Sequence, residues 1–163
     1  MLIYKRAVPM PAGALLCAKM LMAMLFVCVV IASLTIAAVI AAHVRLGAAQ
    51  YLAIALVAIF GVLPFCAVGF FIGSRATAAA APAATNLIYL PMAFLSGLWV
   101  PLAFLPEVIR SLAPVWPPYH LAQLAFAAAG LSYEGTVTVH AIVLAVIAIV
   151  FASLAARRLA RVG

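Results

Sequence analysis

Long apolar runs separated by short polar segments dominate this chain of 163 residues. Four runs have the length and apolarity of membrane-spanning helices, at about residues 14–42, 51–73, 84–100 and 137–156. A bilayer core of about 30 Å needs about 20 apolar residues in each helix that crosses it. The pattern therefore predicts an all-α membrane protein with about four transmembrane helices, folded as a single transmembrane domain over residues 1–163.

The third run is interrupted by residues that oppose a regular helix: Pro91, Gly97 and Pro101. A stretch rich in proline and aromatic residues follows, and it is too apolar for an ordinary solvated loop. We expect it to form two short helices, at residues 104–116 and 120–130, the second closed by a glycine. Irregular backbone at membrane depth survives only where protein or a cavity covers its polar groups. The pattern therefore favours a re-entrant helical hairpin on a transport pathway, with a plain interfacial loop as the alternative.

The composition agrees with a membrane location. Hydrophobic residues make up 71% of the chain and charged residues only 7%, so a soluble domain of this size could not hide its apolar surface. The net charge of +7 is no sign of nucleic-acid binding, because the basic residues are scattered between apolar runs and form no stripe. We therefore expect membrane lipids, and no nucleic acid, as partners of this chain.

The basic residues also predict the orientation of the spans, because cytoplasmic loops carry an excess of Lys and Arg. One side of the predicted helices collects most of the basic residues: Lys5, Arg6, Arg75, Arg157, Arg158 and Arg161. The other side has two basic residues and both acids of the chain: Arg45, Arg110, Glu107 and Glu134. We therefore expect both termini in the cytoplasm and the helical hairpin on the opposite face of the membrane.

The sequence shows no arrangement of residues suited to catalysis, and no Walker A loop for binding ATP. The three cysteines form no close pair and the three histidines are far apart in sequence, which argues against a metal site. No Asp or Glu lies within a predicted span, whereas proton- and cation-driven transporters commonly carry one there. We therefore expect a chain that is not an enzyme and that relies on a partner to drive any uphill transport.

Four residues supply most of the polar atoms of the third run: Asn86, Tyr89, Ser96 and Trp99. At about 100° per residue they fall on one broad face, provided that Pro91 leaves the helical register intact. A polar face inside an apolar span turns toward protein or a water-filled pathway. We expect these residues to line a substrate pathway. The alternative is that they pack against other helices, with Trp99 as an anchor at the membrane interface.

The first short helix of the expected hairpin carries one acid and one base, Glu107 and Arg110, a single helical turn apart. We expect this pair to cap and orient the hairpin, with a small contribution to stability because exposed pairs contribute little. The alternative role for the pair is an external gate.

The segment NLIYLPMAFLSGLWVPL, residues 86–102, followed by Leu105-Pro106 and by Pro118-Tyr119-His120, resembles the permease subunits of type-2 ABC transporters. In that family a helix with the pattern FLSG-x-x-x-P leads into an external re-entrant helical pair, and residues 94–101 match this pattern. The N-terminal YKRAVPMPAG, residues 4–13, also resembles the basic segment with two prolines that adjoins the ATPase-contacting region in the family.

The resemblance implies the permease component of an ATP-driven exporter in the bacterial cytoplasmic membrane, moving a drug, a lipid or a glycan-like substrate. It implies that a separate ATP-binding-cassette subunit binds ATP, that this chain itself holds no cofactor, and that a second permease copy completes the transporter. On this resemblance, Lys5 and Arg6 contact the ATPase subunit, and His120 belongs to the external hairpin.

The chain departs from the family in its number of spans, because members typically have six and four are predicted here. We expect the chain to correspond to the C-terminal portion of the family and to lack its two N-terminal spans. Two other functions stay open: a non-transporting remnant or membrane scaffold, and a small four-span secondary multidrug transporter. The second of these predicts an acidic residue inside a span, which this sequence does not have.

The predicted orientation is testable with single cysteines in a cysteine-free background. Glu134→Cys and Gly163→Cys should react with a membrane-impermeant thiol reagent from opposite sides, because an odd number of predicted spans separates the two positions. Labelling is measured in intact cells and in inverted vesicles. Reaction of both cysteines from the same side would contradict the topology.

Overall fold

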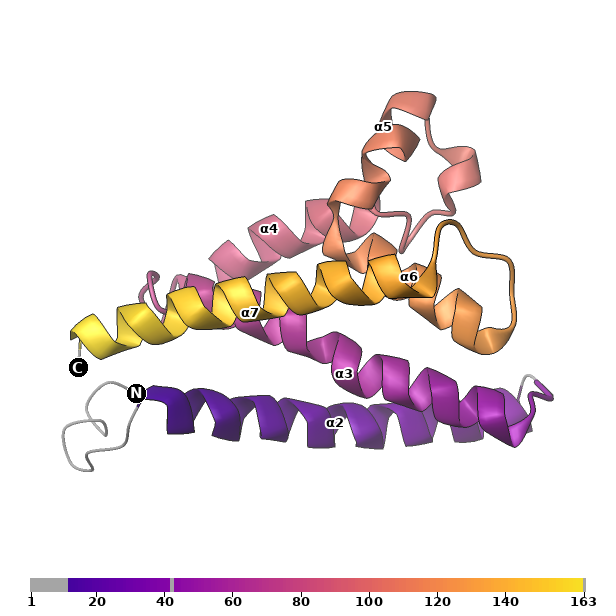
Figure 1. The fold of residues 1–163 in the computed structure, drawn as a ribbon, viewed down its shortest axis with the longest axis horizontal. Helices are drawn as coiled ribbons and strands as arrows, with labels where there is room; N and C mark the ends of the chain where they lie inside the picture. The colour runs from indigo at the N-terminus through magenta and orange to yellow at the C-terminus, as the bar shows by residue number, and fades with distance from the viewer. Residues whose placement is uncertain (1–11, 42, 163) are drawn as a thin grey trace.

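The computed structural model describes residues 12–41 and 43–162 (Figure 1), and in these ranges the chain is helical with no strand. The helices are α2 (Ala12–Ile40), α3 (Ala48–Gly73), α4 (Ala81–Leu95), α5 (Glu107–Leu112), α6 (Pro117–Ala129) and α7 (Val137–Val162). Two 3-10 turns flank α5: η1 (Leu102–Phe104) and η2 (Ala113–Val115). The predicted all-α fold class is confirmed.

Three of these helices are long and apolar enough to cross a membrane: Leu16–Ile40, Ala48–Gly73 and Val137–Leu159. α4 is also apolar but has only 15 residues. At about 1.5 Å per residue it measures about 22 Å, less than the bilayer core of about 30 Å. The third expected span thus ends at Leu95, earlier than residue 100. The described residues therefore contain three helices long enough to span a membrane and one shorter apolar helix.

α3 lies at the centre of the arrangement. It packs against α2, α6 and α7, and α6 also packs against α7 (Figure 1). The approach of α6 to α3 is close, because a Cβ atom built on Gly61 would collide with the side chain of Leu121. A side chain at position 61 would therefore require the side chain of Leu121 to move. In Figure 1, α2 begins and α7 ends at the same end of the bundle.

The end of α4 is a Schellman motif, in which two backbone N–H groups close the last helical turn. The N–H of Gly97 donates to the carbonyl of Phe94 at 3.2 Å, and that of Leu98 donates to the carbonyl of Ala93 at 3.2 Å. Gly97 has φ +80°, a left-handed conformation that disfavours residues with a Cβ atom. α4 runs through Pro91 without ending, so the chain turns at Gly97 rather than at this proline.

Within residues 101–136, α6 folds back onto α3 and α7, whereas α5 contacts η2 and α4. Pro101 precedes η1, α5 is a short helix, and α6 begins at Pro117 and ends at Gly130, which has φ +76°. Gln50 of α3 ties down this end of α6, since its side-chain amide donates to the carbonyl of Ala129 at 2.8 Å. The predicted pair of short helices is present, and the predicted glycine closes the second one.

The turn at Gly97 generates a prediction about stability. Gly97→Ala should lower the free energy of unfolding by about 1–3 kcal/mol, because the backbone is left-handed and the new methyl group meets the side chain of Leu102. Gly69→Ala is the control, because a Cβ there meets no atom within 4 Å. Thermal unfolding of the detergent-solubilised variants measures both. Equal stability of Gly97→Ala and Gly69→Ala would contradict this account of the turn.

Candidate functional site

The end of α4 borders a cavity of about 310 Å³, between α4, α6 and the loop that precedes α7. Polar groups reach its wall from three parts of the chain: Ser96, Gln123, Ser132, Tyr133 and Glu134. Gly97 and Pro101 also line it, beside Ser96. The fold therefore gathers three of the residues singled out from the interrupted run at one site. A wall that mixes polar, aromatic and aliphatic groups suits an amphipathic molecule.

Two hydrogen bonds from α6 hold Glu134 in the cavity wall. The hydroxyl of Tyr119 donates to the carboxylate oxygen Oε2 of Glu134 at 2.8 Å. The backbone N–H of Glu134 donates to Oε1 of Gln123, also at 2.8 Å. Tyr119 and Gln123 are both buried and lie one helical turn apart on α6. One face of α6 therefore positions the acidic residue of the cavity.

The same face of α6 places His120 against His140 in the first turn of α7. Both side chains are buried, and their Nδ1 atoms lie 2.8 Å apart. The remaining ring nitrogens face backbone carbonyls: Nε2 of His120 lies 2.8 Å from the carbonyl oxygen of Pro114, and Nε2 of His140 lies 2.6 Å from that of Glu134. These contacts join η2, α6, the loop and α7 in one polar cluster.

Burial sets the ionisation of the α6 residues in this cluster. Burial raises the pKa of Tyr119 to about 12, and the hydrogen bond and negative charge of Glu134 act in the same direction. Burial also lowers the pKa of His120; the Pro114 carbonyl opposes this change, and the charge of His140 adds to it. At neutral pH Tyr119 therefore keeps its proton, and its hydroxyl donates a hydrogen bond to the carboxylate of Glu134.

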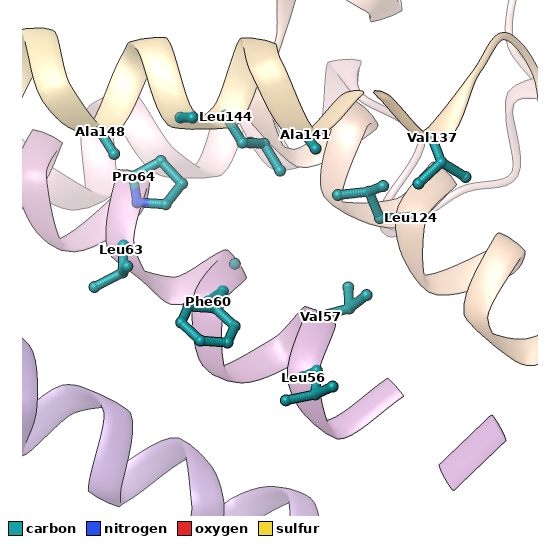
Figure 2. Close-up of a pocket in the computed structure, with 12 residues that line it drawn as sticks. Leu56, Val57, Phe60, Leu63, Pro64, Leu124, Val137, Ala141, Leu144 and Ala148 are labelled. Atoms are coloured by element: carbon teal, nitrogen blue, oxygen red, sulfur yellow. The ribbon is translucent and has the colours of Figure 1, made fainter. Parts of the chain in front are cut away.

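A second cavity, of about 440 Å³, lies between α3, α6 and α7 (Figure 2). In Figure 2, Val57 and Phe60 of α3 lie on one side of it, Leu144 of α7 on another, and Leu124 of α6 beside them. Every residue that lines this cavity is apolar or glycine. Because it offers no side-chain polar group to orient a molecule, we place the candidate site at the polar cavity instead.

The four expected pathway residues do not share one environment. Ser96 is only 2% exposed, and its hydroxyl donates to the carbonyl of Ala93 at 3.0 Å. Asn86, Tyr89 and Trp99 are exposed, and the ring of Tyr89 meets Phe65 of α3 edge-on. The reason is local: α4 ends at residue 95, so the regular helical angles do not extend to Ser96 and Trp99.

The other expected residues fall in three places. Glu107 and Arg110 are exposed at the two ends of α5, where their charges suit the helix dipole, and no side chain caps the start of that helix. His120 is buried in the polar cluster. Lys5 and Arg6, expected to contact an ATPase subunit, lie outside the described residues.

The sequence reasoning missed the association of Tyr119, Gln123, Glu134 and His140. The distance between the histidines in the sequence argued against a metal site, yet the turn between α6 and α7 brings His120 and His140, 20 positions apart, together. One signal was available in the sequence. Tyr119, His120 and Gln123 are polar and recur at helical spacing in an apolar segment, which indicates a buried polar face on that helix.

The Tyr119–Glu134 hydrogen bond generates a prediction that alkaline titration can check. The tyrosinate absorbance of the full chain should include a step near pH 12 that Tyr119→Phe removes. Glu134→Gln should move this step to lower pH, because the negative charge is lost while the burial remains. The stabilising contribution of the protonated phenol should disappear as the pH rises from about 10 to about 12.

Tyr133→Phe is the control for this titration, because Tyr133 is exposed and lies in the same loop as Glu134. It should leave the step near pH 12 in place. Loss of that step in Tyr133→Phe but not in Tyr119→Phe would contradict the assignment.

Comparison with known proteins supports a membrane-transport role. The chain is 34% identical over 62 residues to a protein of Bacillus subtilis (strain 168) that is named as a transport permease, YvfS. The match covers 38% of this chain and 25% of that relative, so the two share only part of their lengths. No family model and no solved structure matches the chain. Its apolar spans and this similarity indicate a multi-pass membrane protein with a permease-like segment.

Proposed function

We propose that this chain is the permease component of an ATP-driven ABC exporter of type 2, in the bacterial cytoplasmic membrane. The observation that carries the proposal is the interrupted helix: α4 ends at Leu95, the chain turns at Gly97, and α6 folds back onto α3 and α7. A polar cavity opens at the interruption. A simple membrane anchor has no need for such a break, whereas a transport pathway needs polar groups inside the membrane.

The lack of acidic residues in the described apolar helices supports a partner ATPase as the energy source. Within the described residues, the three candidate spans contain no Asp or Glu, and α4 contains none either. A secondary transporter driven by protons or cations commonly uses such a residue, so its absence from these helices favours an external energy source. In the proposed complex a separate ATP-binding-cassette subunit binds ATP, and Lys5 and Arg6 contribute to docking that subunit.

The exposed polar side chains of α4 support a second permease copy. Asn86 is exposed in the single chain, although an amide facing lipid is costly. Tyr89 and Trp99 are exposed on the same segment, at 39% and 60%. We propose that α4 of a second copy covers this surface, and that the substrate passes between the two copies and beside Ser96. The mixed lining of the cavity suits an amphipathic drug, lipid or glycan-like cargo.

The test uses inverted membrane vesicles that contain the full chain and a candidate ATP-binding-cassette subunit from the same organism. The two proteins should co-purify, and the vesicles should accumulate an amphipathic fluorescent dye only when ATP is supplied. Ser132→Trp should remove most of this transport, because the indole ring fills the polar cavity. Ser111→Trp is the matched control, because Ser111 is exposed on α5, outside the cavity.

Two results would contradict the proposal. The first is no co-purification of the two proteins and no ATP-dependent accumulation of the dye, which would favour a remnant or a scaffold. The second is accumulation driven by a proton gradient without ATP, which would favour a secondary transporter. Equal transport in the Ser132→Trp and Ser111→Trp variants would remove the cavity from the pathway.

A further inference from the structure

The contact between the rings of His120 and His140 limits how many protons the two side chains hold. The proposed transport role does not involve this property. The two side chains are 5% and 4% exposed, so water does not complete their hydrogen bonding. Each ring therefore depends on its protein neighbours for all its hydrogen bonds. The contacts of four nitrogen atoms decide how many protons the pair holds.

Both Nε2 atoms must carry a proton. Nε2 of His120 faces the Pro114 carbonyl at 2.8 Å, and Nε2 of His140 faces the Glu134 carbonyl at 2.6 Å. A carbonyl oxygen only accepts hydrogen bonds, so each of these nitrogens must donate. These two contacts use two protons, which is the full complement of two neutral imidazole rings.

The contact between the rings requires a third proton. The two Nδ1 atoms are 2.8 Å apart, which is hydrogen-bond distance. If neither nitrogen carried a proton, two lone pairs would face each other in a buried site. One Nδ1 must therefore donate to the other, and the ring that donates is then protonated on both nitrogens.

We propose that His120 and His140 form a proton-binding site, in which the two rings share one extra proton and carry a single positive charge between α6 and α7. This site does not depend on the cargo, on an ATPase subunit or on a second copy. It would be present in the isolated chain, so its failure and the failure of the exporter proposal are distinguishable.

The surroundings indicate which ring holds the extra proton. Burial lowers the pKa of His120, so it disfavours holding the extra proton on that ring. The ring of Tyr119 lies edge-on to both, with centroids 5.4 Å and 5.9 Å away. The hydroxyl of this tyrosine donates to the carboxylate of Glu134, which connects the histidine pair to the acidic residue of the cavity wall.

The neighbouring helices carry few other titratable groups that could affect the protonation of the two rings. α3 packs against both α6 and α7, and its range Ala48–Gly73 contains no Asp, Glu, Lys, Arg or His. Its titratable side chains are Tyr51 and Cys66, and the Tyr51 hydroxyl donates to the carbonyl of Val44. The charged residues of α5, Glu107 and Arg110, are exposed. The arginines of α7 lie in its last turns: Arg157, Arg158 and Arg161. On α2, Lys19 lies in the second turn of the helix, and its remaining titratable groups are thiols.

The shared proton makes the docking of α6 on α7 depend on pH in both directions. Above the usual histidine pKa of about 6.5, the folded pair holds one more proton than the unfolded chain, so stability falls as the pH rises and this proton leaves. Below about 6.5, the unfolded chain binds a proton on each ring, whereas a fourth proton on the folded pair sets two Nδ1–H groups against each other. Stability therefore also falls as the pH drops through the lowered pKa of His120.

The pair also connects to the polar cavity. His140 holds the backbone carbonyl of Glu134, while Gln123 holds its N–H and Tyr119 its carboxylate. Loss of the shared proton leaves the Nε2–H of His140 on this carbonyl, but it removes the hydrogen bond between the Nδ1 atoms that holds His140 against His120. The proton therefore helps to set the position of the loop that forms one wall of the cavity.

The test is nitrogen NMR of the full chain with ¹⁵N-labelled histidine in lipid nanodiscs at pH 7.5. The protein has three histidines, and one of them should be an imidazolium while the other two are neutral. His43→Asn is the matched control, because His43 is exposed with φ +52°, a conformation that asparagine tolerates. This variant should keep one imidazolium and one neutral ring protonated at Nε2.

On titration, the imidazolium of the pair should lose its proton only above the usual value of about 6.5. His120→Asn and His140→Asn should each remove the imidazolium at pH 7.5. All histidines neutral at pH 7.5 in the unmodified chain would overturn the proposal. An imidazolium that persists in both of these variants would overturn it as well.

Discussion

Inside a membrane, the polar groups of an interrupted helix must find partners within the protein, and this requirement shapes everything between Gly97 and Thr136. The backbone at the end of α4 satisfies itself through a Schellman motif. The short helices that follow bring polar side chains, which bond to one another and to backbone carbonyls of η2, α6 and the loop. The hairpin therefore stays folded against α3 and α7 in an otherwise apolar protein.

The polar cluster and the candidate site are two results of the same packing. α6 turns Tyr119, His120 and Gln123 inward, where they hold the loop before α7, and that loop completes the wall of the cavity. A buried hydrogen bond contributes about 1 kcal/mol, but a buried group left without its partner costs more. The members of the cluster are therefore interdependent. This links the position of Glu134 in the cavity to the protonation of the histidines.

Much of the fold could be predicted from the pattern of apolar runs, because span length and helix-breaking residues act locally. The second run was expected at residues 51–73, and α3 occupies Ala48–Gly73. The glycine that closes α6 was also predicted. The third run was overestimated because the pattern remains apolar beyond Leu95, whereas Gly97 adopts a left-handed conformation that ends the helix. The hydrophobic pattern alone does not predict where the backbone turns at such a glycine.

The candidate site was less accessible to prediction, because it depends on contacts between distant segments. Ser96, Gly97 and Pro101 were recognised from the interrupted run, and all three line the cavity. Their partners come from α6 and from the loop after it, so they cannot be found before the packing of α6 is known. The central claim is therefore that residues 117–129 lie folded against α3. Gly61 and Leu121, which are in close contact, offer the most direct measurement of it.

Gly61→Cys and Leu121→Cys would be combined in a cysteine-free chain with a protease site in the turn between α3 and α4. Mild oxidation in native membranes should join the two cysteines, so that the fragments stay together after cleavage and separate on reduction. A Gly69→Cys and Leu121→Cys pair, with the first cysteine two turns farther along α3, should not join. Separation of the oxidised Gly61→Cys and Leu121→Cys fragments would contradict the folded-back arrangement.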